Sequence, residues 1–448
     1  MNGENKKVLM MVENLPVPRD RRVWQEAQAL AAAGWEVSII CPATAAYPRG
    51  HEVIEGIHVW RHPLPAEGEG LAGYVREYSV ALFWEFVLAW RVLRARGFDV
   101  IHACNPPETM FLVGGFFKLL LGKRFVFDHH DLSPELYVAK FGKRGLAHRM
   151  LLWLERMTYR TADVSIATNE SFRQVAIMRG GMDPDRVFVV RSGPDTRRLT
   201  ITPPDPALRQ GAEHLIAYVG VMNSQDGVEY VLDAMRVLVV DQGRNVRAVL
   251  MGDGPMLPQL KRRAEELGIS AWVTFTGWAD DATLIPMLNA ADVCVSPDPA
   301  NDFNHSCTMN KILEYMALAK PVVLFDLTEG RRSAGEAALY ARDNDAADMA
   351  AKIAQLLDDP ALRHRLGAIG RARMERELSW EYQVPRLLSA YAALERNDNR
   401  LSELPSNLLV GDGFSLQVGS QGDSTCKHPA LTREDEEARP RREVPGPL

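Results

Sequence analysis

The stretch KVLMMVENLPVPRDRRVWQEAQALAAAGWEVSIIC, residues 7–41, predicts how the chain begins to fold. Residues 7–12 form an apolar run suited to a buried parallel strand, and a proline-broken loop follows at residues 13–20. Apolar residues then recur at helical spacing up to Gly34, and residues 36–41 form a second apolar run. A strand, a helix and a strand in this order favour a doubly wound parallel sheet.

This alternation continues along most of the chain. The predicted strands of the first half lie at residues 99–102, 124–128, 162–167 and 187–190. Those of the second half lie at residues 215–219, 247–251, 272–275, 292–295 and 321–325. We interpret the proline-rich residues 202–206 as a linker. The pattern therefore predicts an α/β protein with two doubly wound domains at residues 1–203 and 204–378, a helix at 379–396 and a disordered tail at 397–448.

The composition excludes two broad classes of protein. Of the 448 residues, 46% are hydrophobic and 25% are charged, which excludes a mainly disordered or fibrous chain. The net charge of -6 excludes a strongly basic nucleic-acid coat, and we expect no nucleic-acid partner. Residues 1–200 carry 26 Lys and Arg against 22 Asp and Glu, whereas residues 201–396 carry 20 against 27. The difference indicates either two bodies with different duties or a chance fluctuation.

The cysteines and the amino-terminal residues indicate a cytoplasmic protein. The five cysteines are odd in number, scattered and without a CxxC pair, so we expect reduced thiols and neither disulfides nor structural zinc. They are Cys41, Cys104, Cys294, Cys307 and Cys426. The amino terminus is too polar for a signal peptide, and no uninterrupted run reaches about 18 apolar residues.

Polar residues follow several predicted strands of the first half. His102, His130, Asn169 and Arg191 stand at strand ends, which face the ligand crevice in a doubly wound sheet. The run His129-His130-Asp131 suggests a metal site at first sight. Adjacent residues on a strand point to opposite faces, however, and no further ligands are spaced for zinc, so we expect no metal cofactor.

Two segments of the second half have residues suited to a phosphate-bearing ligand. Gly252-Asp-Gly254 follows a strand and permits close approach of a ligand, or else forms a tight turn. Helical spacing places Asn310 and Lys311 about one turn from Glu314. The helix amino terminus and Lys311 attract phosphate, and Glu314 accepts sugar hydroxyl groups. The alternative is an exposed Lys–Glu pair on a surface helix.

Several segments together resemble the retaining nucleotide-sugar glycosyltransferases of family 4. The strongest is EYMALAKPVV at residues 314–323, preceded by GDGP at 252–255 and FTGW at 275–278. ADVCVSP at residues 291–297 and VRSGPD at 190–195 also fit. The likeness extends over about residues 6–396. DHHDLSPELY and EGRRSAGEAALY are similar to the branch that serves exopolysaccharide and O-antigen biosynthesis.

The resemblance implies a GT-B fold, with two Rossmann-like domains facing a central cleft. The second domain then holds most of the donor, the first holds the acceptor, and a final helix crosses back to the first domain. The family's paired glutamates place the ribose ligand at Glu314, but the first glutamate position is Ser306 here. The loop after Gly220 has Asp226 where family members often carry a lysine.

The leaving diphosphate needs positive charge, so other cations must replace that lysine. Lys311, Arg191 and one of Arg331 or Arg332 are candidates in or near the second half. Arg21 or Arg22 is a candidate to reach across from the first domain. A solvated or interdomain ion pair is the alternative for each arginine.

The resemblance also assigns further positions. His130 lies near the transferred sugar and the acceptor, with His129 as the competing position and a structural role as the alternative. Trp278 lies where the nucleobase is held, and His102 is a weaker acceptor-side candidate. The full set comprises His130, Lys311 and Glu314 as catalytic, and Arg21, Arg22 and His102 as acceptor-side or interdomain residues. The donor-binding residues are Arg191, Gly220, Gly252, Gly254, Trp278, Ser306, Asn310, Arg331 and Arg332.

An apolar stretch at residues 116–124 and a basic stretch at 140–149 indicate contact with a membrane surface. A lipid-linked acceptor would be reached this way, at the inner face of the cell membrane. The alternative is a pair of core helices with a solvated basic face.

We expect a retaining transferase that moves a sugar from a nucleotide-diphosphate donor, UDP-linked, to a polysaccharide or its lipid carrier. One alternative is a GT-B nucleotide-sugar epimerase, for which the sequence offers no cluster of proton-shuttling residues. The other is a non-catalytic scaffold that binds sugar nucleotides, which Ser306 and Asp226 favour.

Overall fold

The computed structural model describes residues 6–63 and 70–402, so most of the predicted tail lies outside the described residues. Within these ranges the strands form one sheet of eight and one sheet of six. Each sheet belongs to one half of the chain, and helices connect its strands. The prediction of two successive Rossmann-like domains is confirmed.

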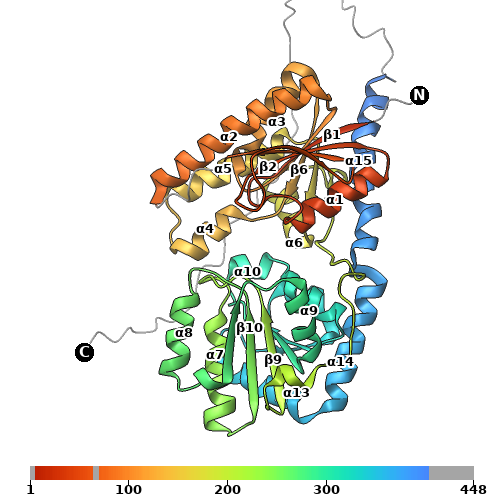
Figure 1. Cartoon of the computed structure of the whole chain (residues 1–448). Coiled ribbons are helices and arrows are strands. Elements are labelled where there is room, and N and C mark those ends of the chain that lie inside the picture. The colour runs from red at the N-terminus through yellow and green to blue at the C-terminus, as the bar shows by residue number, and fades with distance from the viewer. Residues whose placement is uncertain (1–5, 64–69, 403–448) are drawn as a thin grey trace, which may run out of the picture. The chain divides into compact units, whose positions relative to one another are not determined.

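The first sheet, of which Figure 1 labels β1, β2 and β6, has the strand order β3-β4-β2-β1-β5-β6-β7-β8. All neighbours are parallel except β3 and β4. The strands are β1 (Lys7–Met11), β2 (Glu36–Pro42), β3 (Gly50–Ile54), β4 (Ile57–His62), β5 (Val100–Cys104), β6 (Arg124–His129), β7 (Val164–Ala167) and β8 (Val187–Val189). The helices are α1 (Arg21–Ala32), α2 (Gly70–Ala95), α3 (Phe111–Leu121), α4 (Ser133–Phe141), α5 (Leu146–Thr161) and α6 (Glu170–Gln174).

Successive residues of the central strand β1 pack on opposite faces of this sheet, as the two-residue period of a strand requires. Val8 and Met10 join the core that includes α1 and the last helix, α15 (Trp380–Ser402). Leu9 and Met11 join the core that includes α2, α3 and α5. Both faces are therefore covered, which explains why β1 is an unbroken apolar run.

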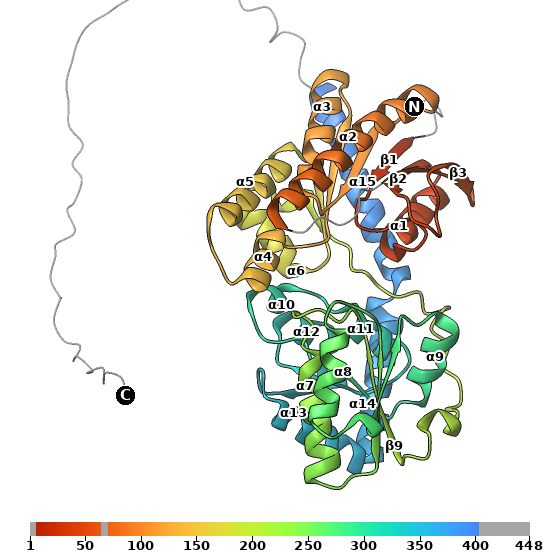
Figure 2. The same ribbon diagram turned by 60° about the vertical axis from the view of Figure 1, so that its left-hand side comes forward.

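The β3–β4 hairpin at one edge of the sheet departs from the predicted alternation (Figure 2). Strand β3 is mostly exposed, so no apolar run indicates it in the sequence. Glu55 and Gly56 form the turn with φ of 50° and 83°, a left-handed conformation that two-residue hairpins use.

The second sheet is fully parallel, with the order β11-β10-β9-β12-β13-β14. Its strands are β9 (His214–Val219), β10 (Val246–Met251), β11 (Val273–Gly277), β12 (Val293–Ser296), β13 (Val322–Phe325) and β14 (Ala338–Ala341). The helices are α7 (Val228–Arg236), α8 (Leu257–Glu266), α9 (Asp281–Ala290), α10 (Asp302–Ser306), α11 (Asn310–Ala317), α12 (Thr328–Ala334), α13 (Ala346–Asp358) and α14 (Pro360–Arg373). Helices α7, α8 and α13 cover one face, and α9 and α11 cover the other.

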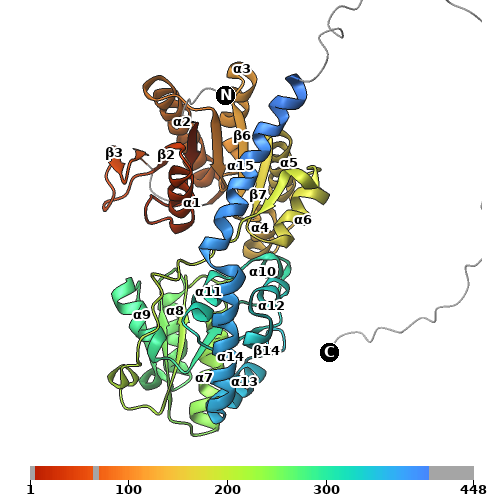
Figure 3. The ribbon, with the colours of Figure 1, turned by 90° about the vertical axis from the view of Figure 1, so that its right-hand side faces the viewer.

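Helix α15 starts after the second domain and packs on the first sheet (Figure 3). Its side chains Leu387, Tyr391 and Leu394 are buried in the core of the first domain. The helix continues to Ser402, beyond the predicted end at residue 396. Each added residue of an existing helix gains one hydrogen bond, so polar residues extend it readily.

In the described part of the chain, no helix is both long and apolar enough to cross a membrane. Cys41, Cys104, Cys294 and Cys307 are free thiols, and Cys426 lies outside the described residues.

Candidate functional site

The loops after β9 and β10 pack tightly against each other at the carboxyl end of the second sheet. The amide of Gly252 donates to the carbonyl of Gly277 at 2.9 Å, and that of Met222 donates to the carbonyl of Asp253 at 2.9 Å. A Cβ atom on Gly252 would lie 1.8 Å from the carbonyl oxygen of Gly220, and one on Gly254 would lie 2.5 Å from that of Met222. The chain itself therefore requires both glycines, as the tight-turn interpretation states.

Lys311 extends from the first turn of α11 toward this pair of loops. Its Nζ lies 2.7 Å from Oδ1 of Asp298 and 5.1 Å from the ring centre of Tyr218. A Cβ atom on Gly220 would lie 3.2 Å from Cε of Lys311, so the side chain ends beside the loop after β9. Burial alone lowers the pKa of Lys311, but Asp298, Tyr218 and Asp226 outweigh it and hold that pKa above its ordinary value.

Asp226, at the position where the family resemblance leads one to expect a lysine, belongs to the same group. Its Oδ2 accepts the backbone amide of Asn223 at 3.0 Å, and the positive charge of Lys311 lowers its pKa. Burial raises the pKa of Asp226 despite that ammonium group. The loop carries an acid and the helix supplies the cation.

Glu314, one turn farther along α11, takes part in an ion network that joins the two domains. Its Oε1 lies 2.5 Å from Nη2 of Arg198 and 3.4 Å from Nη1 of Arg21. Both arginines also contact Oδ1 of Asp281, at 2.7 Å and 2.8 Å. We call Arg21, Arg198, Asp281 and Glu314 the Glu314 network. Arg21 is the member from the first domain, and its side chain is 55% exposed.

Arg22 turns the other way, into the first domain. It donates from Nη2 to Oδ1 of Asp128 at 2.8 Å and from Nη1 to the carbonyl of Val190 at 2.8 Å, and it lies 3.0 Å from Oε1 of Glu26. Burial lowers the pKa of Arg22 but the two carboxylates raise it, and the net direction is upward. Arg22 therefore does not contact the second domain, because buried carboxylates hold it.

Both predicted histidines lie around Asp128. His130 has Nε2 2.5 Å from Oδ2 of Asp128 and 3.0 Å from Nε of Arg22, and its side chain is 16% exposed. His102 is fully buried; its Nδ1 lies 2.8 Å from the hydroxyl of Tyr391 on α15, and burial lowers its pKa. We call this group of side chains in the first domain the Asp128 cluster. It consists of Arg22, Glu26, His102, Asp128 and His130.

Three further arginines lie around α12. Arg191 is nearly buried, with Nη1 3.4 Å from Oγ1 of Thr308 and 3.8 Å from Oε2 of Glu329, and burial lowers its pKa. Arg332 lies 2.6 Å from the other oxygen of Glu329. Arg331 pairs instead with Asp326 and stacks at 4.0 Å on the ring of Tyr340. Arg191 and Arg332 thus share Glu329, whereas Arg331 lies apart from them.

The remaining predicted residues lie near α10 and α11. The Oγ of Ser306 donates to the carbonyl of Asp302, and the carbonyl of Ser306 accepts from Nδ2 of Asn169 in the first domain at 2.8 Å. Asn310 is exposed at the start of α11. The Trp278 ring is 65% exposed, and the guanidinium of Arg19 lies 5.9 Å from its centre.

The sequence prediction missed Arg198 and Asp281, which complete the Glu314 network. Arg198 follows the quoted segment VRSGPD by three residues, so a basic residue there was the available signal. Asp281 opens α9 directly after the N-cap Asp280, which makes it look like an ordinary first-turn acid.

Models of two protein families match the chain, one in each domain. Residues 20–193 match "Glycosyl transferase 4-like domain", and residues 213–359 match "Glycosyl transferases group 1". The chain is 29% identical over 399 residues to a D-inositol 3-phosphate glycosyltransferase of Thermomonospora curvata, covering 83% of this chain and 90% of that protein. It is also 29% identical over 307 residues to an alpha-maltose-1-phosphate synthase of Mycolicibacterium smegmatis, covering 62% of this chain and 76% of that protein.

Two solved structures with the same fold cover most of the chain. A sucrose-phosphate synthase from Thermosynechococcus elongatus aligns with a TM-score of 0.72 and 20% identity, over 88% of this chain and all of that one. HepE from Anabaena, solved in complex with UDP and glucose, aligns with a TM-score of 0.62 and 16% identity, over 89% of this chain and all of that one. At these identities the likeness establishes the fold alone.

Proposed function

We propose that this chain, which matches a glycosyl transferase 4-like domain model at residues 20–193 and a group 1 glycosyl transferase model at residues 213–359, transfers a sugar from a nucleotide-diphosphate donor to a glycan or lipid-linked glycan acceptor. We propose further that the donor is UDP-linked and that the anomeric configuration is retained. The UDP complex of HepE belongs to a protein of the same fold and supports this choice of donor.

The observation that carries the proposal is the position of Lys311 and Glu314 on one helix. Lys311 ends beside the loop after β9, where the missing family lysine would stand. An ammonium group has three N–H donors, and Asp298 takes one of them. The others serve the diphosphate, together with the first amides of α11, which no side chain caps.

Glu314 has the role of ribose ligand in this proposal. Its Oε1 is held by Arg198 and Arg21, which fixes the direction of the carboxylate. Oε2 then accepts the ribose hydroxyl groups. Arg21 thereby connects donor binding in the second domain with the first domain, where we assign the acceptor.

His130 stands at the transferred sugar in this scheme. Asp128 and Arg22 fix its imidazole, and the side-chain oxygen of Asn105 accepts its backbone amide at 2.7 Å. The departing phosphate takes the acceptor proton in front-face attack, so the chain needs no separate base. Its own residues orient the sugar, neutralise the diphosphate and exclude water.

The surface of α3 to α5 supports membrane contact as part of the proposal. Leu119 at the end of α3 is 85% exposed, and Leu146 and Trp153 on α5 are also exposed. Phe117, by contrast, is fully buried. The core interpretation therefore applies to part of the stretch 116–124, while its end presents apolar side chains to a lipid surface. Lys140, Lys143, Arg144 and Arg149 accompany them and suit anionic lipids at the inner face of the cell membrane.

The test is release of UDP from a panel of UDP-sugars when purified protein meets bacterial lipid-linked glycans in detergent. We expect release to depend on both the sugar nucleotide and the lipid fraction, and to be lost in K311A. Binding of UDP-sugars without any acceptor-dependent release would contradict the proposal and favour a scaffold.

A further inference from the structure

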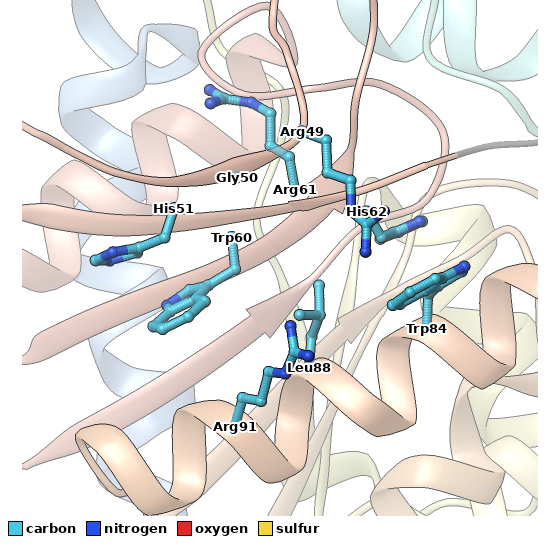
Figure 4. Close-up of a pocket in the computed structure, with 9 residues that line it drawn as sticks. All are labelled: Arg49, Gly50, His51, Trp60, Arg61, His62, Trp84, Leu88 and Arg91. Carbon is cyan, nitrogen blue, oxygen red and sulfur yellow. The ribbon is translucent and has the colours of Figure 1, made fainter.

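A pocket lies in the first domain, between the β3–β4 hairpin and α2 (Figure 4). Its volume is about 150 Å³, comparable to a cavity that encloses one six-membered ring. The residues around it are Arg49, Gly50, His51, Trp60, Arg61, His62, Trp84, Leu88 and Arg91. None of the residues described so far at the Glu314 network or Lys311 contributes to it.

The lining of this pocket is rich in guanidinium groups and has no acid among its described residues. Arg49 and Arg91 form no ion pair with any described residue, and both are exposed to an incoming ligand. Arg61 is buried; it pairs with Glu52 and donates from Nη2 to the carbonyl of Val17 at 2.8 Å. Two of the three positive charges are thus uncompensated.

Two buried N–H donors of the lining have no acceptor in the described part of the chain. They are Nε1 of the Trp60 indole and Nε of Arg61. A buried donor without an acceptor is costly, so native proteins usually supply a partner. Both atoms are shielded from the pocket as well as from solvent, so it is the unpaired charges of Arg49 and Arg91 that favour a ligand with negative charge and acceptor oxygens.

The pocket also offers aromatic surface. The indole of Trp60 stacks on His51 with ring centres 4.0 Å apart, and Arg49 lies 4.6 Å above the ring of Trp84. Figure 4 shows Arg91 rising from α2 into the space between Trp60 and Trp84. Indole rings pack against the C–H face of a sugar, and guanidinium groups pair with carboxylate or phosphate.

Two buried carboxylates, Glu13 and Glu85, lie beside His62. Oε2 of Glu13 is 3.1 Å from Nε2 of His62. Burial, together with the neighbouring Glu13, raises the pKa of Glu85 well above its ordinary value. A raised pKa favours the uncharged form of Glu85, which lowers the negative charge beside the pocket.

The pocket adjoins the loop that leads to the candidate site. Arg61 bonds Val17 and His62 faces Glu13, and both partners belong to the loop between β1 and α1. The same loop leads into Arg21 of the Glu314 network. A ligand in the pocket therefore lies on the acceptor side of the proposed reaction.

We propose that this pocket binds one anionic sugar residue, a sugar acid or a sugar phosphate, with Arg49 and Arg91 on the anion and an indole on the ring. Its role as part of the acceptor rests on the proposed function, but its binding of an anionic sugar does not. The proposal narrows the acceptor to an acidic or phosphorylated glycan.

Calorimetry and tryptophan fluorescence with saturating UDP present test this proposal. The probes are glucuronate, glucose 1-phosphate, glucose and inorganic phosphate. We expect the two anionic sugars to bind, and the double variant R49Q/R91Q to bind them at least about tenfold more weakly. R94Q, on the exposed side of the same helix and outside the lining, is the matched control with unchanged affinity. The better of the two anionic sugars identifies carboxylate or phosphate as the natural group.

Three results would overturn the proposal. They are equal binding of glucose, equal binding of inorganic phosphate, or unchanged affinity in R49Q/R91Q. If the unmodified protein binds the anionic sugars but does not bind UDP, the result contradicts the proposed function and leaves the inference about this pocket standing.

Discussion

Arg21 and Arg22 are adjacent in the sequence but belong to two different ion clusters, one partly exposed and one buried. Arg21 is half exposed and reaches Glu314 and Asp281 in the second domain. Arg22 is buried on Asp128 within the first domain. Exposed pairs are weak and exchange partners with ligands, whereas a buried pair is fixed, because separating it leaves a charge without solvent. The Glu314 network is thus suited to binding, and the Asp128 cluster to holding His130 in place.

The largest effect should come from breaking the buried cluster. Arg22→Met leaves Asp128 buried without its main partner, and we expect a loss of about 3–5 kcal/mol in the free energy of unfolding. Urea denaturation measures this. Arg21→Met is the matched control, with a change below about 1 kcal/mol. Equal losses in both variants would show that the two clusters do not differ in kind.

The next effect concerns the charge beside the loop after β9. Lys311→Ala should weaken UDP binding about 10- to 100-fold, because a charged hydrogen bond to the diphosphate is lost. Uridine, which has no phosphate, should bind almost unchanged in the same calorimetric titration.

The double variant K311A/D298N controls for the carboxylate left unpaired and should show the same loss of UDP affinity. An equal loss of uridine affinity in either variant would instead indicate a structural role for Lys311.

The neighbours His129 and His130 extend the comparison to pH. Burial lowers the pKa of His129 to about 3, and its Nδ1 lies 2.6 Å from the hydroxyl oxygen of Tyr159. The unfolded chain, with an ordinary histidine pKa near 6.5, takes up this proton first, so stability falls as the pH drops from about 6.5 toward 3.

Between pH 6.0 and 4.5 we expect His129 to contribute a loss of about 2 kcal/mol, at about 1.4 kcal/mol per pH unit. The measurement is the slope of unfolding free energy against pH for the unmodified protein and for His129→Gln. Parallel slopes in the two proteins would refute the assignment.

The smallest effect is expected at Glu314. Glu314→Gln keeps the shape but removes the charge that accepts the ribose hydroxyl groups, and we expect about a tenfold loss of affinity. Uridine and UDP should lose affinity equally, in contrast to K311A. An unchanged uridine affinity in Glu314→Gln would show that Glu314 does not bind the ribose.

The two domains were predictable because the strands of their parallel sheets are buried on both faces. Such strands appear in the sequence as short, uninterrupted apolar runs. The β3–β4 hairpin was less so, since β3 is an exposed edge strand. Its one signal is Glu55-Gly56, a turn that places both residues at positive φ. Edge strands lack the two-sided burial that makes a strand visible in a sequence.

The site was predictable in its helix but not in its partners. Lys311 and Glu314 lie one turn apart, as helical spacing requires. Arg198 and Arg21 are 116 and 293 positions away from Glu314, and no local pattern connects them. The direction of Arg22 depends on Asp128, which a different strand supplies. Long-range ion pairs of this kind follow from the fold, not from the local sequence.

Because α15 lies at the end of the described chain, the first domain cannot complete its core until the second domain has been synthesised. The last strand of the first domain ends at Val189, but the core of that domain is completed by side chains of α15, namely Leu387, Tyr391 and Leu394. At about 5–20 residues per second, roughly 200 residues of delay correspond to about 10–40 s. For that interval the emerging first domain exposes the apolar face that α15 will cover. That apolar face is a surface that the finished protein does not expose, and it is covered only when the last helix has been made.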